Sequence, residues 1–365
     1  MSPTHKKTGS ERHAVSATDV ARLAGVSQAT VSRAFTEGAS ISRELKEKVL
    51  AAAEVVGYQP NVIARSLTTS RTKIIGLVMG DFDNPFYSVV IEELSLELQR
   101  QNLHPLLFVV APGGSVDEVL PQLLQYRVDA ILIVAATVSS SMAQVCLKRG
   151  LPVVLFNRSV PDAPTHVVAT DNYRGGWVVA DLLVGSGHKR LGYISGHVNT
   201  TTSQDRQRGF LDRLELLGVT GVNMVQGNYS YRGAMESAMS LLKSTDRPEA
   251  IFCANDLMAC GVVDAARVLG IDIPGELSIV GFDDIPQARW DAYSLTTLRG
   301  QVDAMVRSAT DLLVRLSQSQ SPERVSITLP AELVIRRSAR VSQEAIDAIA
   351  NSGLNVFQEQ PAPEA

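Results

Sequence analysis

The chain has 365 residues, of which 45% are hydrophobic and 20% are charged; this composition excludes a disordered chain, and the length exceeds that of one ordinary domain. Charge is unevenly distributed, because residues 1–73 hold 11 Lys and Arg against 6 Asp and Glu, whereas the remaining residues hold 23 against 32. A basic head on an acidic body is typical of a protein that binds nucleic acid, since phosphate neutralisation supplies much of the affinity, and chance variation in surface charge is the alternative.

Nothing in the sequence predicts a membrane or an export segment. No apolar run approaches the roughly 18–20 residues that a bilayer-spanning helix needs. The first twenty residues lack the apolar centre of a secretory signal. Cys146, Cys253 and Cys260 form neither a CxxC pair nor a disulfide framework. We therefore expect a cytoplasmic protein with no membrane partner.

Three short helical patterns occupy residues 15–59. The first begins at "SATD", in which Ser16 and Asp19 have the spacing of a capping box. The second and the third begin after Ser27 and Ser42, residues that are good N-caps. Residues 15–59 are therefore predicted to form a small three-helix domain.

The second of these helices has two different sides. Its apolar residues Val31, Ala34 and Phe35 share one side at a period of 3.6 residues. In a DNA groove, a glutamine can pair with adenine and an arginine with guanine or phosphate. A solvated helix face is the plain alternative. The residues of the other side are Gln28, Ala29, Ser32 and Arg33.

The connecting segment 60–70 is not rich in glycine or serine, as a flexible linker would be. Pro60 suits the start of a helix, but the eight residues "PNVIARSL" are too few for a stable isolated helix in water. This segment is predicted to be a helix that needs a partner, with a plain tether as the alternative. Residues 1–14 and 341–365 carry no sustained periodicity, and we expect both to be flexible tails.

Short Val/Ile/Leu-rich runs alternate with helical stretches from residue 74 onward. Such runs are typical of strands buried on both faces of a parallel sheet. The predicted fold class is therefore α/β, with a three-helix headpiece followed by two doubly wound parallel-sheet subdomains. The predicted strands are "IIGLVM" (74–79), "PLLFVV" (105–110), "AILIV" (130–134), "PVVLF" (152–156), "RLGYIS" (190–195), "AIFCA" (250–254) and "LSIVGF" (277–282).

Polar and aromatic residues follow several of these strands, where ligands of such folds bind. Sugar-like ligands need aromatic faces and planar polar groups that hydrogen-bond adjacent hydroxyls. Packing in the core is the alternative for Phe86, and caps or ion pairs are the alternative for Asp256 and Asp284. The candidates are Asp83, Asn84, Phe86, Tyr87, Asn157, Arg158, Asn255, Asp256, Asp283 and Asp284.

An enzyme is not predicted. The six histidines have no metal-ligand spacing, and neither a GxSxG nor a GxxxxGK[ST] motif is present. If Asp283 and Asp284 extend a strand, their side chains point to opposite sides and cannot form a paired acid/base site. We expect no cofactor and no metal.

The sequence "ATDVARLAGVSQATVSRAFTEGASISRELKEKVLAAAEVVGYQPNVIARSL" resembles the headpiece of the lactose/galactose repressor family of bacterial transcription regulators. The body resembles the same family, and its periplasmic sugar-binding relatives, through "DNPFY", "FNR", "TDN", "DRQRGF", "ANDLMA" and "VGFDD". The resemblance covers residues 16–340. It implies a dimer that binds a near-palindromic operator through two headpieces.

For DNA binding, the resemblance implies that the second helix, which starts at Ser27, lies in the major groove. Gln28 and Ala29 hold the two positions that chiefly select bases in the family. Segment 60–70 would be a hinge helix that pairs with its dimer mate in the minor groove, where Leu67 wedges into a base step and Ala64 permits close approach. The further contacts implied are those of Thr30, Ser32 and Arg33 with phosphates or base edges, and of Ser16 and Asn61 with the backbone.

For the ligand, the resemblance implies a sugar, a polyol or a sugar acid as effector. Arg206 matches the family's ligand-binding arginine, Thr202 lies near it, and Tyr229 aligns with an aromatic residue that often stacks on the sugar. Asn255 and Asp283 match further ligand-binding positions. The sequence departs from the family at two places: Gly300 stands where many members carry a ligand-contacting Gln, with Gln301 one position later, and Asn157 replaces a common Asp.

The function predicted is that of a dimeric, effector-controlled repressor of carbohydrate-metabolism genes; the alternative is a periplasmic-type sugar-binding protein without a transcriptional role. Effector binding would close the cleft between two subdomains and so change hinge pairing. The predicted body is 71–340, with an N-subdomain of about 71–170 and 301–327 and a C-subdomain of about 171–300 and 328–340.

Overall fold

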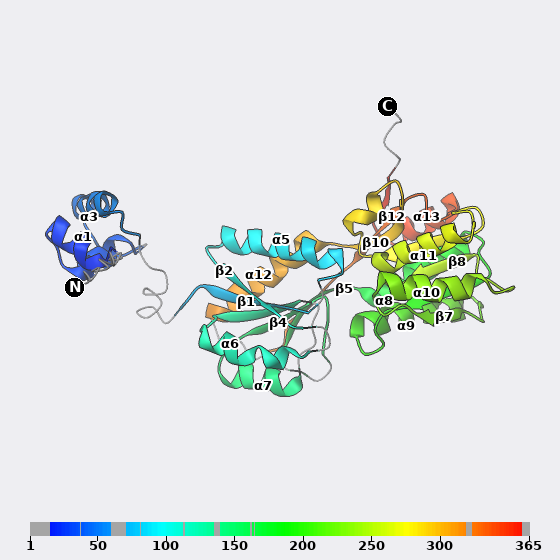
Figure 1. Cartoon of the computed structure of the whole chain (residues 1–365), viewed down its shortest axis with the longest axis horizontal. Helices are drawn as coiled ribbons and strands as arrows, with labels where there is room; N and C mark the ends of the chain where they lie inside the picture. Colours follow the sequence, from blue (N-terminus) through cyan, green and yellow to red (C-terminus); the bar gives the residue numbers. More distant parts are fainter. Residues whose placement is uncertain are drawn as a thin grey trace, which may run out of the picture. The chain divides into compact units, whose positions relative to one another are not determined.

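The structure, a computed structural model, divides the chain into two compact units, Met1–Thr72 and Lys73–Ala365 (Figure 1). The hinge candidates Asn61, Ala64 and Leu67 lie outside the described residues. No helix of the described part is long and apolar enough to cross a membrane. The residues described are 15–36, 38–59, 71–80, 82–111, 114–134, 139–160, 163, 165–318 and 323–359.

The first unit is a three-helix domain, as the sequence predicts. Its helices are α1 (Ala17–Ala24), α2 (Gln28–Ala34) and α3 (Arg43–Val56). The side chains of Ser27 and Ser42 accept hydrogen bonds from the backbone N–H groups of Thr30 and Leu45 and so begin α2 and α3. A small apolar core joins the helices, with Val20, Val31 and Val49 at its centre.

The second unit contains two sheets. The first has six parallel strands in the order β11-β5-β4-β3-β1-β2. Helices α5 and α12 cover one face, and α6 and α7 cover the other (Figure 1). The elements are β1 (Ile74–Met79), α5 (Pro85–Arg100), β2 (His104–Val109), η1 (Val116–Glu118), α6 (Leu120–Gln125), β3 (Ala130–Val134), α7 (Ser140–Lys148), β4 (Val153–Phe156), β5 (His166–Thr170), α12 (Val302–Gln318) and β11 (Ser326–Leu329).

The second sheet has seven strands in the order β13-β12-β10-β9-β8-β6-β7, and only β10 and β12 pair antiparallel. The elements are α8 (Asn172–Gly185), β6 (Leu191–Ser195), α9 (Thr201–Leu216), β7 (Asn223–Gln226), α10 (Tyr231–Leu242), β8 (Ala250–Cys253), α11 (Asp256–Val268), β9 (Ser278–Phe282), η2 (Pro286–Arg289), β10 (Thr296–Gly300), β12 (Ala331–Ile335), α13 (Gln343–Asn351) and β13 (Val356–Gln358).

The chain passes between the two sheets three times. It leaves the first sheet after β5, returns between β10 and α12, and leaves again between β11 and β12. The boundary expected at residue 327 falls inside β11, and the passage lies at Pro330. The polar residues that follow β1, β4, β8 and β9 are thereby brought to the region between the sheets.

The expectation of a flexible tail over 341–365 is wrong for most of that segment. Residues Gln343–Asn351 form α13, and Val356–Gln358 form β13, which pairs with β12. Helix α13 is stable because Ala345, Ile346 and Ile349 are buried and Ser342 caps its first turn. Two turns are too short to show a sustained apolar period in the sequence.

Candidate functional site

Helix α2 presents a polar side to solvent. Gln28, Ala29, Ser32 and Arg33 are exposed, whereas Val31 and Ala34 are buried. The helix thus has the two sides that the sequence predicts: the apolar side is buried in the core, and the polar side is exposed to a partner. Short side chains on the exposed side let a helix approach a groove closely.

The remaining described headpiece candidates lie at the starts of helices. Ser16 precedes α1, and its backbone N–H and its hydroxyl bond the carboxylate of Asp19 at 3.0 and 2.7 Å. Ser27 and Thr30 share a bond between their hydroxyls at 2.9 Å. The amide nitrogen of Gln28 donates to the hydroxyl of Thr18 on α1. Each has a local partner, and contact with DNA remains a prediction for all of them.

Arg206 is at the centre of the polar residues between the two sheets. It lies on α9, is only 1% exposed, and its guanidinium stacks 3.6 Å above the ring of Phe282. Its Nη2 donates to Asp283 at 2.8 Å, its Nε donates to the amide oxygen of Asn172 at 2.8 Å, and its Nη1 donates to the carbonyl of Ala254. Within the described part of the chain, three of its five N–H groups are used, and two are left for a further acceptor.

Charge pairing keeps Arg206 ionised in its buried position. Burial, the largest single effect, lowers the pKa of this guanidinium, but Asp283, Tyr229 and Tyr87 together outweigh burial and raise the pKa of Arg206 above its ordinary value.

Two buried amide groups near this pair have unused capacity. Asn157 follows β4 with a left-handed backbone (φ 58°), and its amide oxygen has no hydrogen-bond partner among the described residues. Asn255 caps α11 through its amide oxygen, which accepts from the N–H of Met258 at 3.0 Å. The amide nitrogen of Asn255 has no partner among the described residues. Buried polar groups without a partner are rare, and they point to a missing ligand or water.

The predicted site residue Thr202 and its neighbour Thr201 link helix α9 to the segment that follows β4. The hydroxyl of Thr202, on α9, donates to the backbone carbonyl of Asn157 at 2.8 Å. Next to it, the hydroxyl of Thr201 accepts from the N–H of Ser159 and donates to its carbonyl, both at 3.1 Å. These contacts hold the end of β4 against the start of α9.

The aromatic candidates divide between the core and the site. Phe86 and Tyr87 are both buried at the start of α5 with their rings 5.2 Å apart, and Phe86 lines a cavity that Asp283 also lines. Tyr229 has a left-handed backbone (φ 55°), and its ring packs edge-on against His197. A Cβ at Gly196 would lie 2.2 Å from the Tyr229 ring, so a glycine there is what lets the ring approach.

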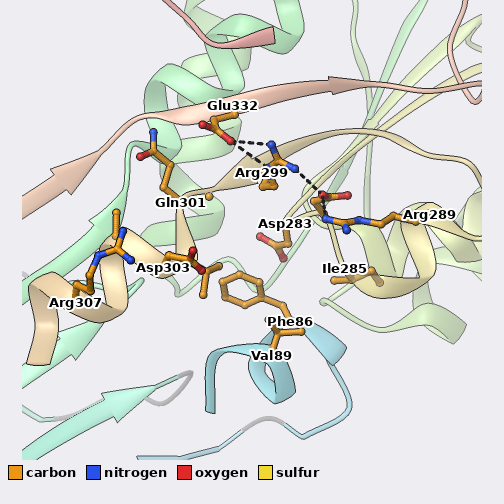
Figure 2. A pocket seen from close by; sticks show the side chains of 14 residues that line it. Phe86, Val89, Asp283, Ile285, Arg289, Arg299, Gln301, Asp303, Arg307 and Glu332 are labelled. Carbon is orange, nitrogen blue, oxygen red and sulfur yellow. Dashed lines mark hydrogen bonds and ion pairs between the residues drawn. The ribbon is translucent and has the colours of Figure 1, made fainter. Parts of the chain in front are cut away.

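The cavity lined by Phe86 and Asp283 has a volume of about 460 Å³ (Figure 2), within the usual range for small-molecule sites. Asp284, another of the candidates that follow the strands, also lines it, whereas Tyr87, Asn157, Thr202, Arg206, Tyr229 and Asn255 are not among its lining residues. Asp83 is exposed, and Arg158 is half-buried. The other lining residues are Val89, Asp284, Ile285, Arg289, Arg299, Gly300, Gln301, Val302, Asp303, Ala304, Arg307 and Glu332.

Gly300 and Gln301 both line this cavity. A Cβ at Gly300 would lie 2.7 Å from the hydroxyl of Thr170, so a side chain there requires that its neighbours shift. Gln301 is the nearest glutamine that could replace the contact missing at position 300, and that role stays a prediction.

Asp256 and Asp284 form caps or ion pairs, which is the alternative stated for them above. Asp256 is fully buried; one carboxylate oxygen accepts from Thr297 at 2.6 Å, and the other accepts from the N–H of Ile285 at 3.0 Å. Asp284 forms ion pairs with arginines rather than sharing a site with Asp283. A paired-carboxylate acid/base site is therefore not formed by these residues.

Sequence reasoning missed several contributors. Asn172, inside the quoted "TDN", accepts a hydrogen bond from Nε of Arg206, a role that the motif alone does not predict. Arg299 and Glu332 face each other across the antiparallel pair β10–β12. The sequence did not predict β12, so it could not predict this pairing. Within the described residues, no group of three His, Cys, Asp or Glu side chains is arranged to hold a metal ion.

Two family models match the chain. The model described as "Bacterial regulatory proteins, lacI family" matches residues 17–61, and that described as "Periplasmic binding protein-like domain" matches residues 180–339. The HTH-type transcriptional repressor PurR of Photobacterium profundum is 30% identical over 328 residues, which are 88% of this chain and 98% of that protein. The HTH-type transcriptional regulators GalR of Escherichia coli and DegA of Bacillus subtilis are 30% and 33% identical, each over 88% of this chain and over 94% and 96% of their own.

Solved structures show the same fold. The lac repressor dimer bound to operator and the anti-inducer ONPF has a TM-score of 0.81 at 24% identity, covering 89% of this chain and 98% of that chain. A complex of the transcriptional regulator CelR with cellobiose has a TM-score of 0.67 at 25% identity, covering 89% of this chain and 100% of that chain. The arrangement of a three-helix domain before two sheets is thus shared with these proteins.

Proposed function

The chain belongs to the lacI family of bacterial regulatory proteins, and from this premise we propose that it is an effector-controlled transcriptional repressor of carbohydrate-metabolism genes. It acts as a homodimer on a near-palindromic operator. Its effector is a sugar or a sugar derivative such as a polyol or a sugar acid.

The exposed side of α2 supports the DNA-binding part of this proposal. Gln28 and Ala29 lie in the first turn of the helix, where major-groove readers contact base edges, and Arg33 lies in its last turn. No ion pair involves Arg33 among the described residues, so its charge is available to a phosphate.

The unsatisfied groups around Arg206 carry the effector part. Arg206 retains two N–H donors, while Asn157 and Asn255 offer an acceptor and a donor that are buried and unused. Donors and acceptors in fixed positions beside a planar guanidinium suit the adjacent hydroxyls of a sugar. The cellobiose complex of CelR, at 25% identity, is consistent with this chemistry.

Switching would use the three connections between the sheets. An effector that contacts Arg206 on one side and the end of β4 on the other stabilises one relative position of the two sheets. We propose that segment 60–70, with Asn61, Ala64 and Leu67, forms a minor-groove hinge whose folding depends on that position. Whether the effector releases or retains DNA follows from which conformation it binds more tightly.

Selection from a random double-stranded DNA library tests the DNA-binding part without any prior operator. The full chain is expected to recover near-palindromic sites of about 16–20 base pairs. Affinity for the recovered site should fall steeply with salt. Recovery of no common sequence, or affinity that salt does not change, would refute the regulator proposal.

A thermal-shift series tests the effector part, with cellobiose, ribose, polyols and sugar acids as probes. Asn157→Gly removes the unsatisfied amide, and glycine accommodates the left-handed backbone (φ 58°) without strain. The matched control is Asn102→Gly, which makes the same change at an exposed residue with φ 55°.

We expect a shift with at least one probe that Asn157→Gly abolishes and Asn102→Gly preserves. A shift that both variants retain would remove Asn157 from the site. No shift with any of these probes in the unsubstituted chain would refute a sugar-like effector.

A further inference from the structure

The segment 340–359 follows the region that matches the periplasmic binding protein-like domain, which ends at residue 339. It is docked firmly onto the second sheet and its helices. The N–H of Ser342 donates to the hydroxyl of Ser186 at 3.0 Å, and its own hydroxyl donates to the carbonyl of Gly185 at 3.1 Å. Gly185 lies close to Ala345: a Cβ added at Gly185 would lie 3.0 Å from the methyl group of Ala345.

After α13 the chain returns to the sheet, where the side chains of Phe357 and Glu359 contact arginines. Strand β13 pairs in parallel with β12, and the N–H of Glu359 continues this pairing by donating to the carbonyl of Ile335 at 3.1 Å. The ring of Phe357 lies under the guanidinium of Arg299, 4.6 Å from its centroid. The carboxylate of Glu359 accepts from Nε of Arg336 at 2.7 Å.

Arg299 and Arg336 both form ion pairs with Asp284. Its carboxylate is completely buried and is paired with Arg336 at 2.7 Å, with Arg289 at 2.9 Å and with Arg299 at 3.6 Å. Arg299 also donates twice to Glu332, at 2.9 and 3.1 Å (Figure 2). Burial lowers the pKa of Arg336, and its bonds to Glu359 and Asp284 outweigh burial and raise it.

The positive and negative charges of this network are equal in number only when Glu359, which follows β13, is included. Three arginines, Arg289, Arg299 and Arg336, face three carboxylates, Asp284, Glu332 and Glu359. Without Glu359, Arg336, which is 7% exposed, would lack its second carboxylate. Excess buried charge is costly because little water solvates it.

The network also holds a strained turn. Asp283 and Asp284 both have positive φ angles, 110° and 51°, a region that non-glycine residues occupy only when their surroundings enforce it. The enforcing contacts of Asp284 are the three arginines. Asp283, the preceding residue, pairs with Arg206 and lines the cavity.

We propose that the C-terminal strand is a positioning element of the effector site: Phe357 and Glu359 hold Arg299 and Arg336 on Asp284, and thereby fix Asp283 against Arg206. The inference rests on the proposed function, since it assigns a role in that site. It makes residues beyond the matched domain part of the machinery that shapes the cleft.

Hydrogen exchange of the full chain, read by mass spectrometry on peptides, tests this without an effector or DNA. Glu359→Gln keeps the shape of the side chain and removes its charge. Losing a partly exposed charge-assisted bond should open the segment 283–300 more often, so its amides should exchange about 3–10-fold faster. Peptides from β6 and β7, toward the other edge of the sheet, should not change.

The matched control is Glu344→Gln, the same change at an exposed glutamate of α13, which should leave segment 283–300 at its original exchange rate. Glu359→Asp retains the charge and should restore part of the protection. The positioning role is refuted if faster exchange is confined to residues 356–359, or if all peptides change equally, as a loss of global stability would cause. Neither result depends on sugar binding, so failure here leaves the proposed function standing, and failure of every sugar probe leaves this test intact.

Discussion

Replacing Arg206 by alanine should lower the unfolding free energy of the larger unit by about 3–5 kcal/mol, because the change leaves a buried carboxylate without its partner. Asp283 is 8% exposed, and it pairs with Arg206 at 2.8 Å. The alanine also forfeits the bonds to Asn172 and Ala254 and the contact with Phe282. The cost therefore lies at the upper end for a single substitution.

The loss should depend on pH in a defined direction. Burial raises the pKa of Asp283, and in the variant no guanidinium opposes that effect. A carboxyl whose pKa is higher in the folded than in the unfolded state favours folding in its protonated form. The stability deficit of Arg206→Ala is thus complete at high pH and shrinks as the pH falls through the folded pKa of Asp283.

Urea denaturation at fixed protein concentration measures both effects. Trp177 and Trp290 are the two tryptophans of the chain, and both belong to the larger unit, so their fluorescence reports its unfolding alone. The control is the double variant Arg206→Met with Asp283→Asn, which has no buried charge and should lose about 2 kcal/mol less than the single variant. A single-variant loss below about 1 kcal/mol, or a deficit that does not shrink as the pH is lowered, would refute the buried-pair reasoning.

Ala29→Ser should change the base selected at one position of each half-site, by about 1–3 kcal/mol of discrimination, in a repeated library selection; an unchanged consensus would exclude Ala29 from base reading. Arg33→Ala should weaken binding to all sequences and reduce the salt slope by about one, and a sequence-dependent loss would instead make Arg33 a base reader. Leu67→Ala should reduce affinity for the selected site more than for random DNA, measured by fluorescence anisotropy, and equal losses would contradict a wedge in the minor groove. Gly209→Ala places a Cβ 1.9 Å from the carbonyl oxygen of Tyr173, so α8 and α9 must move apart, which should lower the free energy of unfolding by about 1–3 kcal/mol in the same urea assay. An unaltered midpoint would show that these helices can move apart without cost.

The central strands could be predicted because strands buried on both faces consist mostly of apolar residues. Strands β3 and β9 are buried at every residue and read as continuous apolar runs. The edge strands β7 (Asn223–Gln226) and β11 (Ser326–Leu329) have no buried residue and alternate between partly and fully exposed positions. Four residues of that kind cannot be distinguished from a loop until the neighbouring strand is known.

The antiparallel end of the second sheet was beyond prediction for a related reason. Strand β12 is partly buried at Glu332, whose charge interrupts the apolar run. That glutamate is tolerated because Arg299 lies directly opposite in the register and donates two bonds to it. A charge pair of this sort becomes visible only when both strands are placed.

The sequence also placed polar residues at the ends of the strands without separating those that hold a ligand from those that hold the fold. Hydrogen-bond accounting separates them. Asp256 accepts protein hydrogen bonds at both carboxylate oxygens, and Asp284 is paired with arginines, so both have structural roles. Asn157 and Asn255 are equally buried but each keeps one amide atom unused. Because an unused buried polar atom costs free energy, these two amide atoms are the ones that the proposed effector would satisfy.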